Sequence, residues 1–231
     1  PDKYLFVVNG DGTIAVVSWL QEFGQETVGF VPWETNGAFV NVAPIFGGYW
    51  AIVDRVIGGV MTRTLEEFSE DAALDCAALY NPAQVSHLAG ETVHIWGNGW
   101  YGGQTSVSAA GVVADNGNLL LNSQVGFHFN SKVQPWPVEN IQSERAGMLK
   151  VRLIRGSVSV LDTISFQCRA NRTVKTIDAY QAGDDVALPP TEKTKLYKFN
   201  VFGNRDHPEL EFIKHIPGPF HVLAVTQEVQ V

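Results

Sequence analysis

The densest group of acidic side chains is the first place in this sequence where chemistry could be expected. Glu66 and Glu67 are followed by Glu70, Asp71 and Asp75. Paired carboxylates act as acid and base in glycoside hydrolysis, and carboxylate oxygens bind calcium. The loop pattern of EF-hand calcium sites is missing, and acidic residues are also favoured where a short helix starts. We therefore interpret these residues as structural or solvent-exposed acids.

Other reactive residue types do not form a recognisable pattern. The six histidines are not spaced with Cys, Asp or Glu as zinc ligands are; they are His87, His94, His128, His207, His215 and His221. Residues 97–102 fit the glycine pattern GxGxxG, but the β-rich sequence that follows argues against the helix that a phosphate site needs. We predict no catalytic residue, no cofactor and no metal, and hence no enzyme.

Three aromatic residues around a glycine-rich turn give an alternative. Trp96, Trp100 and Tyr101 flank Gly97-Asn98-Gly99. Aromatic rings can form a stacking platform for a sugar, although core packing is the commoner role of tryptophan. A carbohydrate-binding β module, with these three residues as the ligand-stacking site, therefore stays open as a second reading.

The composition limits the classes of partner. The chain has 231 residues, of which 45% are hydrophobic and 17% charged, and its net charge is −8. A groove that holds nucleic acid needs a basic surface, whereas an acidic surface lets a polyanion pass without sticking. Since we find no apolar run of the ~18 residues that a membrane helix needs, we predict no membrane segment. Cys76 and Cys168, far apart in sequence, are expected to be free thiols.

Short alternating strands and glycine-rich turns predict an all-β fold in three parts. Residues 1–57 should form a four-stranded antiparallel meander sheet shaped like a propeller blade, residues 58–139 a small β-barrel, and residues 140–231 a β-sandwich. Within them we expect strands at 38–45, 49–56 and 60–68 and one short helix within residues 65–79. A lone sheet cannot bury both of its faces, so the first part must pack on something else.

A set of motifs then indicates a family. They are Arg55 with the turn Gly58-Gly59, the strand Thr62–Phe68 (TRTLEEF), the phrase His87–Val93 (HLAGETV), the segment Val125–Glu139, the opening Tyr4–Ile14 and the closing Pro219–Val229. With these motifs, nearly the whole chain resembles the C-terminal part of the tail nozzle, or distal tail-tube, proteins of short-tailed bacteriophages. The middle module is similar to the first catalytic-cysteine half-domain of ubiquitin-activating enzymes, a likeness of fold that gives Cys76 no catalytic role.

The resemblance implies a structural protein of the virion. Members of the family form a homo-oligomeric ring, commonly sixfold, at the far end of a short tail, and viral DNA is ejected through its lumen. The expected neighbours are tail adaptor or tube proteins and fibre proteins, and the expected place of assembly is the host cytoplasm. DNA would pass transiently, without specific binding. In the alternative reading, the chain would be a tail-associated module that binds a carbohydrate receptor of the host.

Overall fold

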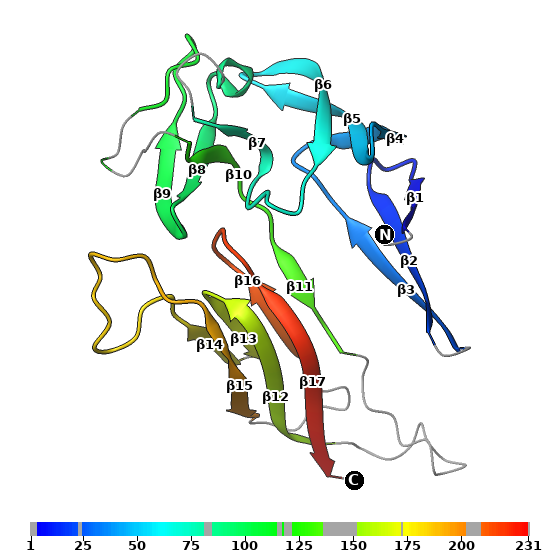
Figure 1. The fold of residues 1–231 in the computed structure, drawn as a ribbon, viewed down its shortest axis with the longest axis vertical. Helices are drawn as coiled ribbons and strands as arrows, with labels where there is room; N and C mark the ends of the chain where they lie inside the picture. The colour runs from blue at the N-terminus through cyan, green and yellow to red at the C-terminus, as the bar shows by residue number, and fades with distance from the viewer. Residues whose placement is uncertain are drawn as a thin grey trace. The chain divides into compact units, whose positions relative to one another are not determined.

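The computed structural model of the chain describes residues 4–22, 25–80, 85–114, 117, 122–135, 152–171, 173–201 and 209–230; within these ranges, the side chains of 19–27 are not described. The chain divides into two compact units (Figure 1). Unit 1 contains Pro1–Gly97 and Gly102–Phe129, and unit 2 contains Asn98–Tyr101 and Asn130–Val231.

Unit 1 begins with two antiparallel sheets of three strands each. Sheet A has the order β1-β2-β3, with strands Tyr4–Val8, Ile14–Glu22 and Gln25–Trp33. Sheet B has the order β4-β5-β6, with strands Ala38–Ile45, Gly48–Ile57 and Val60–Phe68. The two sheets share a buried core of Ile14, Val16, Phe39, Ala51 and Val53. Sheets A and B are therefore the two layers of one sandwich module.

A further four-stranded sheet, sheet C, has the order β7-β10-β8-β9; it belongs to unit 1 except for Trp100 and Tyr101 at the start of β9, which belong to unit 2. Its strands are Asp75–Leu79 (β7), Thr92–Gly97 (β8), Trp100–Ser106 (β9) and Gln124–Phe127 (β10), and a short 3-10 helix, η1, spans Ser86–Leu88. Its core contains Val93, Val125 and Phe127 from the strands, together with Leu88 and Val107. Asn98 and Gly99 join β8 to β9 with φ of 51° and 79°, the two positive values that a tight type I′ turn requires.

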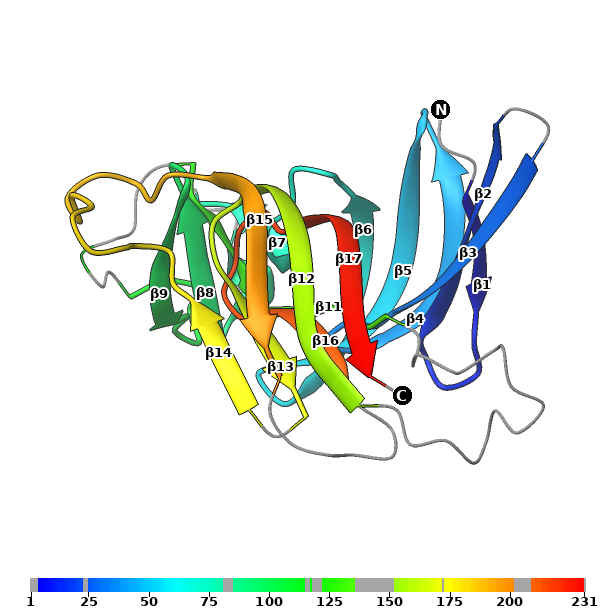
Figure 2. The same cartoon turned by 90° about the horizontal axis from the view of Figure 1, so that it is seen from below.

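Unit 2 is a β-sandwich of two antiparallel sheets. Sheet D has the order β11-β16-β13-β14, with strands Ser131–Val133, Leu210–Lys214, Phe166–Ala170 and Thr173–Ile177. Sheet E has the order β15-β12-β17, with strands Lys193–Asn200, Arg152–Thr163 and His221–Gln230, which lie side by side in Figure 2.

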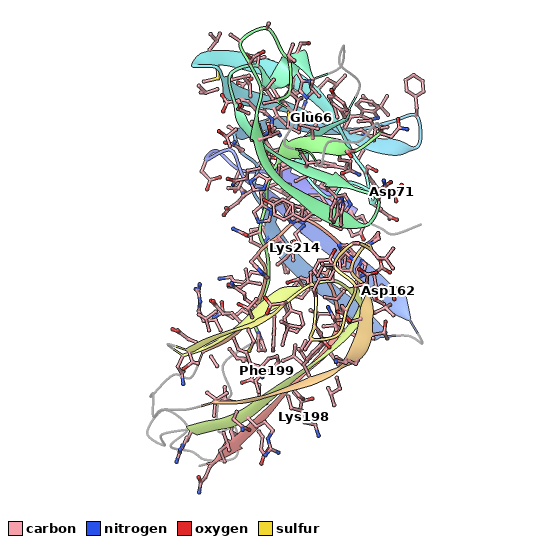
Figure 3. The ribbon with its side chains drawn as sticks, turned by 90° about the vertical axis from the view of Figure 1, so that its left-hand side faces the viewer. Glu66, Asp71, Asp162, Lys198, Phe199 and Lys214 are labelled. Carbon is pink, nitrogen blue, oxygen red and sulfur yellow. The ribbon has the colours of Figure 1, made fainter. Side chains whose placement is uncertain are left out.

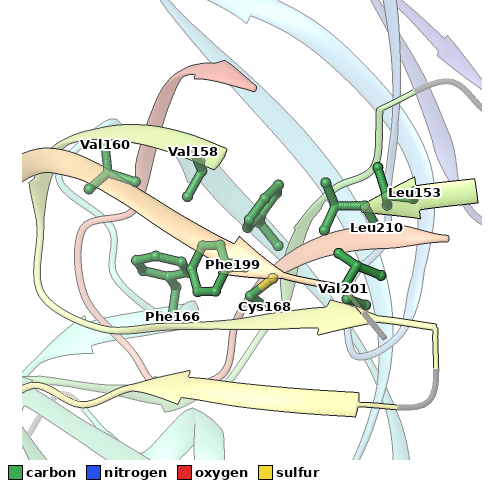
Figure 4. Close-up of a cluster of buried hydrophobic side chains, with 10 residues drawn as sticks. Leu153, Val158, Val160, Phe166, Cys168, Phe199, Val201 and Leu210 are labelled. Carbon is green, nitrogen blue, oxygen red and sulfur yellow. The ribbon is translucent and has the colours of Figure 1, made fainter. Parts of the chain in front are cut away.

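Buried side chains from both sheets of unit 2 form its core. Val158 of sheet E and Phe166 and Cys168 of sheet D belong to this cluster, which Figure 4 shows between the strands. Lys198 and Phe199 illustrate the alternation along β15, because the lysine is exposed and the next side chain is buried (Figure 3). The predicted C-terminal sandwich is thus seen in the structure.

The predicted all-β fold is confirmed, but two parts of its arrangement were wrong. Within the described residues none of the sheets closes into a barrel, because β6 pairs with β5 and sheet C stays open between its edge strands β7 and β9. The predicted four-stranded meander is instead split over sheets A and B, since β4 pairs with β5 and not with β3. Folding one sheet over the other lets Ile14 and Val53 become fully buried, which a single sheet would not allow.

The helix expected within residues 65–79 was also wrong. Strand β6 continues to Phe68, a turn follows at Ser69–Asp71, and β7 begins at Asp75. Pairing of β6 with β5 and of β7 with β10 outweighs the local helix preference of the alanines. The three-part division at 57/58 and 139/140 stays a prediction.

Candidate functional site

Arg55 is the centre of the best-defined polar cluster among the described residues. It lies on the core-facing side of β5 and is buried. Its Nε and Nη2 donate to the two carboxylate oxygens of Glu66, each at 2.7 Å. Nη1 and Nη2 also donate to Asp75 at 3.0 and 2.8 Å, and Nη1 donates to the carbonyl oxygen of Asn36 at 2.7 Å. All five N–H groups of this guanidinium therefore have acceptors.

Three separate segments supply these acceptors. Glu66 comes from β6, Asp75 from the start of β7, and Asn36 from the connection between β3 and β4. Thr35 donates through Oγ1 to Asp75 at 2.8 Å, and the backbone N–H of Asn36 donates to the same oxygen at 2.9 Å. Figure 3 labels Glu66 within this part of unit 1. The cluster thus ties sheet B to sheet C.

The electrostatics fit a structural role. Burial by itself would lower the pKa of Arg55, but its hydrogen bonds to Glu66 and Asp75 more than offset this, so the pKa is raised above its ordinary value. Cys76 follows Asp75 directly, and burial, together with the charge of Glu66, raises the pKa of its thiol to about 12. Such a thiol stays protonated at neutral pH and is not a nucleophile.

The acidic residues that the sequence groups together are separated by the fold. Glu66 and Asp75 are both engaged by Arg55, whereas Glu67, Glu70 and Asp71 are exposed. Within the described parts of the chain, no group of three or more His, Cys, Asp or Glu is placed to hold a metal ion. The interpretation of these acids as structural or solvent-exposed agrees with this placement.

The aromatic residues of the alternative reading lie on one hairpin. Trp96 is near the end of β8, and Trp100 and Tyr101 begin β9, on either side of the Asn98-Gly99 turn. All three rings are half-buried, and burial raises the pKa of Tyr101. Trp100 and Tyr101 are consecutive in β9, so their side chains point to opposite faces of that strand.

His94 and His128 form a close pair in unit 1. Their ring centroids are 5.3 Å apart, and Nε2 of His94 lies 3.2 Å from the side-chain amide nitrogen of Gln104. Burial, with a smaller contribution from His128, lowers the pKa of His94. No sequence pattern pairs these two histidines, because 33 residues separate them.

The outer face of sheet A is an unusual surface. Side chains directly opposite one another in the register point to the same side of a sheet, so the residues that alternate with the buried Ile14 and Val16 point outward. Every outward position whose side chain is described is apolar; they are Leu5, Val7, Ala15, Val17, Val28, Phe30 and Pro32. Phe30 is 73% exposed and Leu5 61% exposed. Contiguous exposed apolar surface of this kind marks interaction sites.

The outer face of sheet B carries a second apolar surface. Along β5, Trp50, Ile52 and Val56 point outward, since they alternate with the buried Ala51 and Val53. On β6, Leu65 lies opposite Ile52 and Met61 opposite Val56, so these two side chains point outward as well. Met61 is 68% exposed and Leu65 62% exposed. The charges Asp54 and Arg63 also lie on this face, but they neutralise each other through two hydrogen bonds of 2.6 and 2.8 Å.

The charge is divided very unequally between the units. Unit 1 contains 13 Asp and Glu but three Lys and Arg, so its net charge is −10; unit 2 contains 11 and 13, so its net charge is +2. These values add to the −8 of the whole chain. Counting charge along the sequence would have found this asymmetry, which sequence reasoning missed.

Comparisons with known proteins do not assign a family. No protein-family model matches the sequence, and no curated protein is significantly similar to it. In the described part of the chain, no helix has the length and hydropathy to cross a membrane.

Proposed function

We propose that this chain is a structural protein of a bacteriophage virion and not an enzyme. In this proposal, copies of the chain form the distal tube or nozzle ring of a short tail, sixfold as in the family that the sequence resembles. The ring contacts the tail adaptor or tube protein and the fibre proteins, and it is assembled in the host cytoplasm. Viral DNA leaves through its lumen, and no cofactor takes part.

The observation that carries this proposal is the apolar outer face of sheet A. Exposing Phe30, Leu5 and their neighbours to water costs about 25 cal/mol per Å², a cost that an assembly partner removes. A sheet whose two faces are both apolar is typical of an element between two packed layers. The structure describes one of those layers, sheet B, and in this proposal a further copy of the chain supplies the other.

The charge distribution supports passage of DNA without binding. Double-stranded DNA carries ~2 negative charges per base pair, so a strongly acidic wall repels it and a basic wall would retain it. Unit 1, at −10, supplies the acidic surface. Exposed basic residues lie in unit 2, where Arg155 is 3.3 Å from Glu228 and Arg169 is 3.3 Å from Glu211, so part of their charge is already neutralised.

Measuring the mass of the full chain in solution tests this proposal, with electron microscopy of the assembled species. We expect a closed ring of several copies with a central opening wide enough for duplex DNA. We also expect no retention of duplex DNA at physiological salt. A chain that stays monomeric at all accessible concentrations would contradict the proposal.

The aromatic hairpin keeps a carbohydrate-binding module as a second candidate. Its supporting observation is that Trp96, Trp100 and Tyr101 lie at one turn with half-buried rings. A glycan array separates the two candidates. Glycan binding by a monomer, lost in Trp100→Ala, would favour the module, and assembly that Trp100→Ala leaves unchanged would favour the ring.

A further inference from the structure

Sheets A and B expose their apolar faces on opposite sides of one sandwich module. Ile14 and Val16 of sheet A and Ala51 and Val53 of sheet B meet in the shared core, so the outer faces point in opposite directions. A copy of the chain therefore presents two apolar surfaces of different shape, one centred on Phe30 and the other on Leu65. Both need cover.

We propose that the outer face of sheet A in one copy packs on the outer face of sheet B in the next copy. This inference rests on the proposed function, because it names the contact that would build the ring. The stack would repeat, between copies, the sheet-on-sheet contact that already exists within the module, with sheets ~10 Å apart.

The chemistry of the two faces suits this contact. On sheet A, every outward side chain that is described is apolar and uncharged. On sheet B, Asp54 and Arg63 already pair with each other, so covering them leaves neither charge without a partner. Glu67 lies at the end of β6, where it can stay at the rim in contact with water.

The largest side chains of both faces are mostly exposed. On sheet A, Phe30, Leu5 and Val28 are 73%, 61% and 51% exposed, and on sheet B, Met61, Leu65 and Val56 are 68%, 62% and 58% exposed. Large side chains present on the order of 150 Å² each, so a contact of the two faces would remove several hundred Å² from water, against the roughly 1,000 Å² at which specific interfaces begin.

Symmetry favours a contact between unlike faces. If sheet A packed on sheet A of a second copy, the result would be a closed dimer that leaves the face around Met61 and Leu65 exposed on both copies. A contact of A on B uses both faces of every copy. Such head-to-tail contacts close into a ring when the rotation from copy to copy allows it, and otherwise continue as an open filament. A second copy of this chain is therefore the occupant that covers both surfaces at once.

Two substitutions distinguish these arrangements. Phe30→Lys places a charge on the face of sheet A, and Leu65→Lys places one on the face of sheet B. Val112→Lys is the matched control, since Val112 is 60% exposed in unit 1 and lies outside both sheets. Lysine makes the acidic unit less negative, so a loss of assembly cannot come from added repulsion. Because the two target residues are exposed, we expect the variants to keep the thermal unfolding midpoint of the parent; Phe30→Ser and Leu65→Ser serve if either fails to fold.

The readout is the mass distribution of the full chain, alone and in mixtures. We expect Phe30→Lys and Leu65→Lys each to raise the concentration for half-assembly at least tenfold, and Val112→Lys to leave it unchanged. An equimolar mixture of the two variants retains one intact A-on-B contact, so it should form dimers that grow no further.

Other results would overturn the proposal in different ways. If neither lysine variant weakens the oligomer that the parent chain forms, the proposed A-on-B interface is wrong, and the proposed ring is not affected. Loss of assembly in Phe30→Lys alone, with Leu65→Lys still forming dimers by itself, would show that sheet A packs on sheet A and would contradict the A-on-B contact. If the parent chain is monomeric at every concentration, both this interface and the proposed function are wrong. A different protein would then be the partner that covers these faces.

Discussion

Nη2 of Arg55 lies 2.8 Å from Oδ1 of Asp75, and this ion pair joins strands of two different sheets. Asp75 opens β7 of sheet C, and Arg55 lies near the end of β5 of sheet B. The side chain of Arg55 is fully buried and that of Asp75 is 17% exposed. A buried guanidinium needs such partners because leaving it unpaired costs several kcal/mol.

Asp75→Ala should therefore lower the free energy of unfolding by about 3 kcal/mol. It removes two acceptors of Arg55 and the acceptor of the Thr35 hydroxyl. Urea unfolding monitored by tryptophan fluorescence measures the loss. Asp54→Ala is the control, because it breaks the exposed pair with Arg63, which water already screens, and should lower the free energy of unfolding much less than Asp75→Ala does. Equal losses in the two variants would contradict the role given to Arg55.

Gly126→Ala should destabilise the contact between β10 and β7. A Cβ at Gly126 would lie 2.6 Å from the carbonyl oxygen of Asp75 and 3.0 Å from Cα of Ala77, so the backbones would have to separate. We expect a loss of about 1–3 kcal/mol in the free energy of unfolding. Gly10→Ala is the matched control, since its Cβ would meet nothing within 4 Å. A thermal unfolding midpoint equal to that of the control would show that this packing is looser than described.

Stability should decrease as the pH falls below about 6.5. The pKa of His94 is lower in the folded chain than its ordinary value of 6.5, because of burial and of the neighbouring His128. The unfolded chain therefore binds a proton at a higher pH than the folded chain does, so the contribution of neutral His94 is present above pH 6.5 and is lost below it. The urea concentration at the unfolding midpoint, measured between about pH 5 and pH 8, should fall less steeply towards acid pH in His94→Gln than in the parent chain. An unchanged slope in that variant would contradict this assignment.

Added salt should strengthen assembly. Copies of unit 1, each with a net charge of −10, repel one another, and salt screens this repulsion over distances beyond about 10 Å. The apolar contact itself is not weakened by salt. Raising NaCl from about 0.05 M to about 0.5 M should therefore lower the concentration for half-assembly at least twofold, as measured by light scattering. Assembly that salt weakens would indicate a contact between acidic and basic surfaces instead.

Local sequence was sufficient to place many strands and turns. The strands at Ala38–Ile45 and Val60–Phe68 were predicted with the bounds that the structure shows, since alternation of side chains and flanking glycines are local signals. The Asn98-Gly99 turn was equally readable, because few residues other than glycine and asparagine accept the positive φ that it requires. The end of the motif segment, residues 136–139, and His207 lie outside the described residues.

The sequence by itself determined an all-β chain with an acidic surface, because composition and short-range periodicity record which residues suit strands and turns. Only the tertiary structure decided that β4 pairs with β5, that Glu66 and Asp75 both hold Arg55, and that the face around Phe30 stays open. Those outcomes depend on contacts between residues far apart in the chain. Their free energy comes from burying surfaces and charges together, and no short stretch of sequence contains that information.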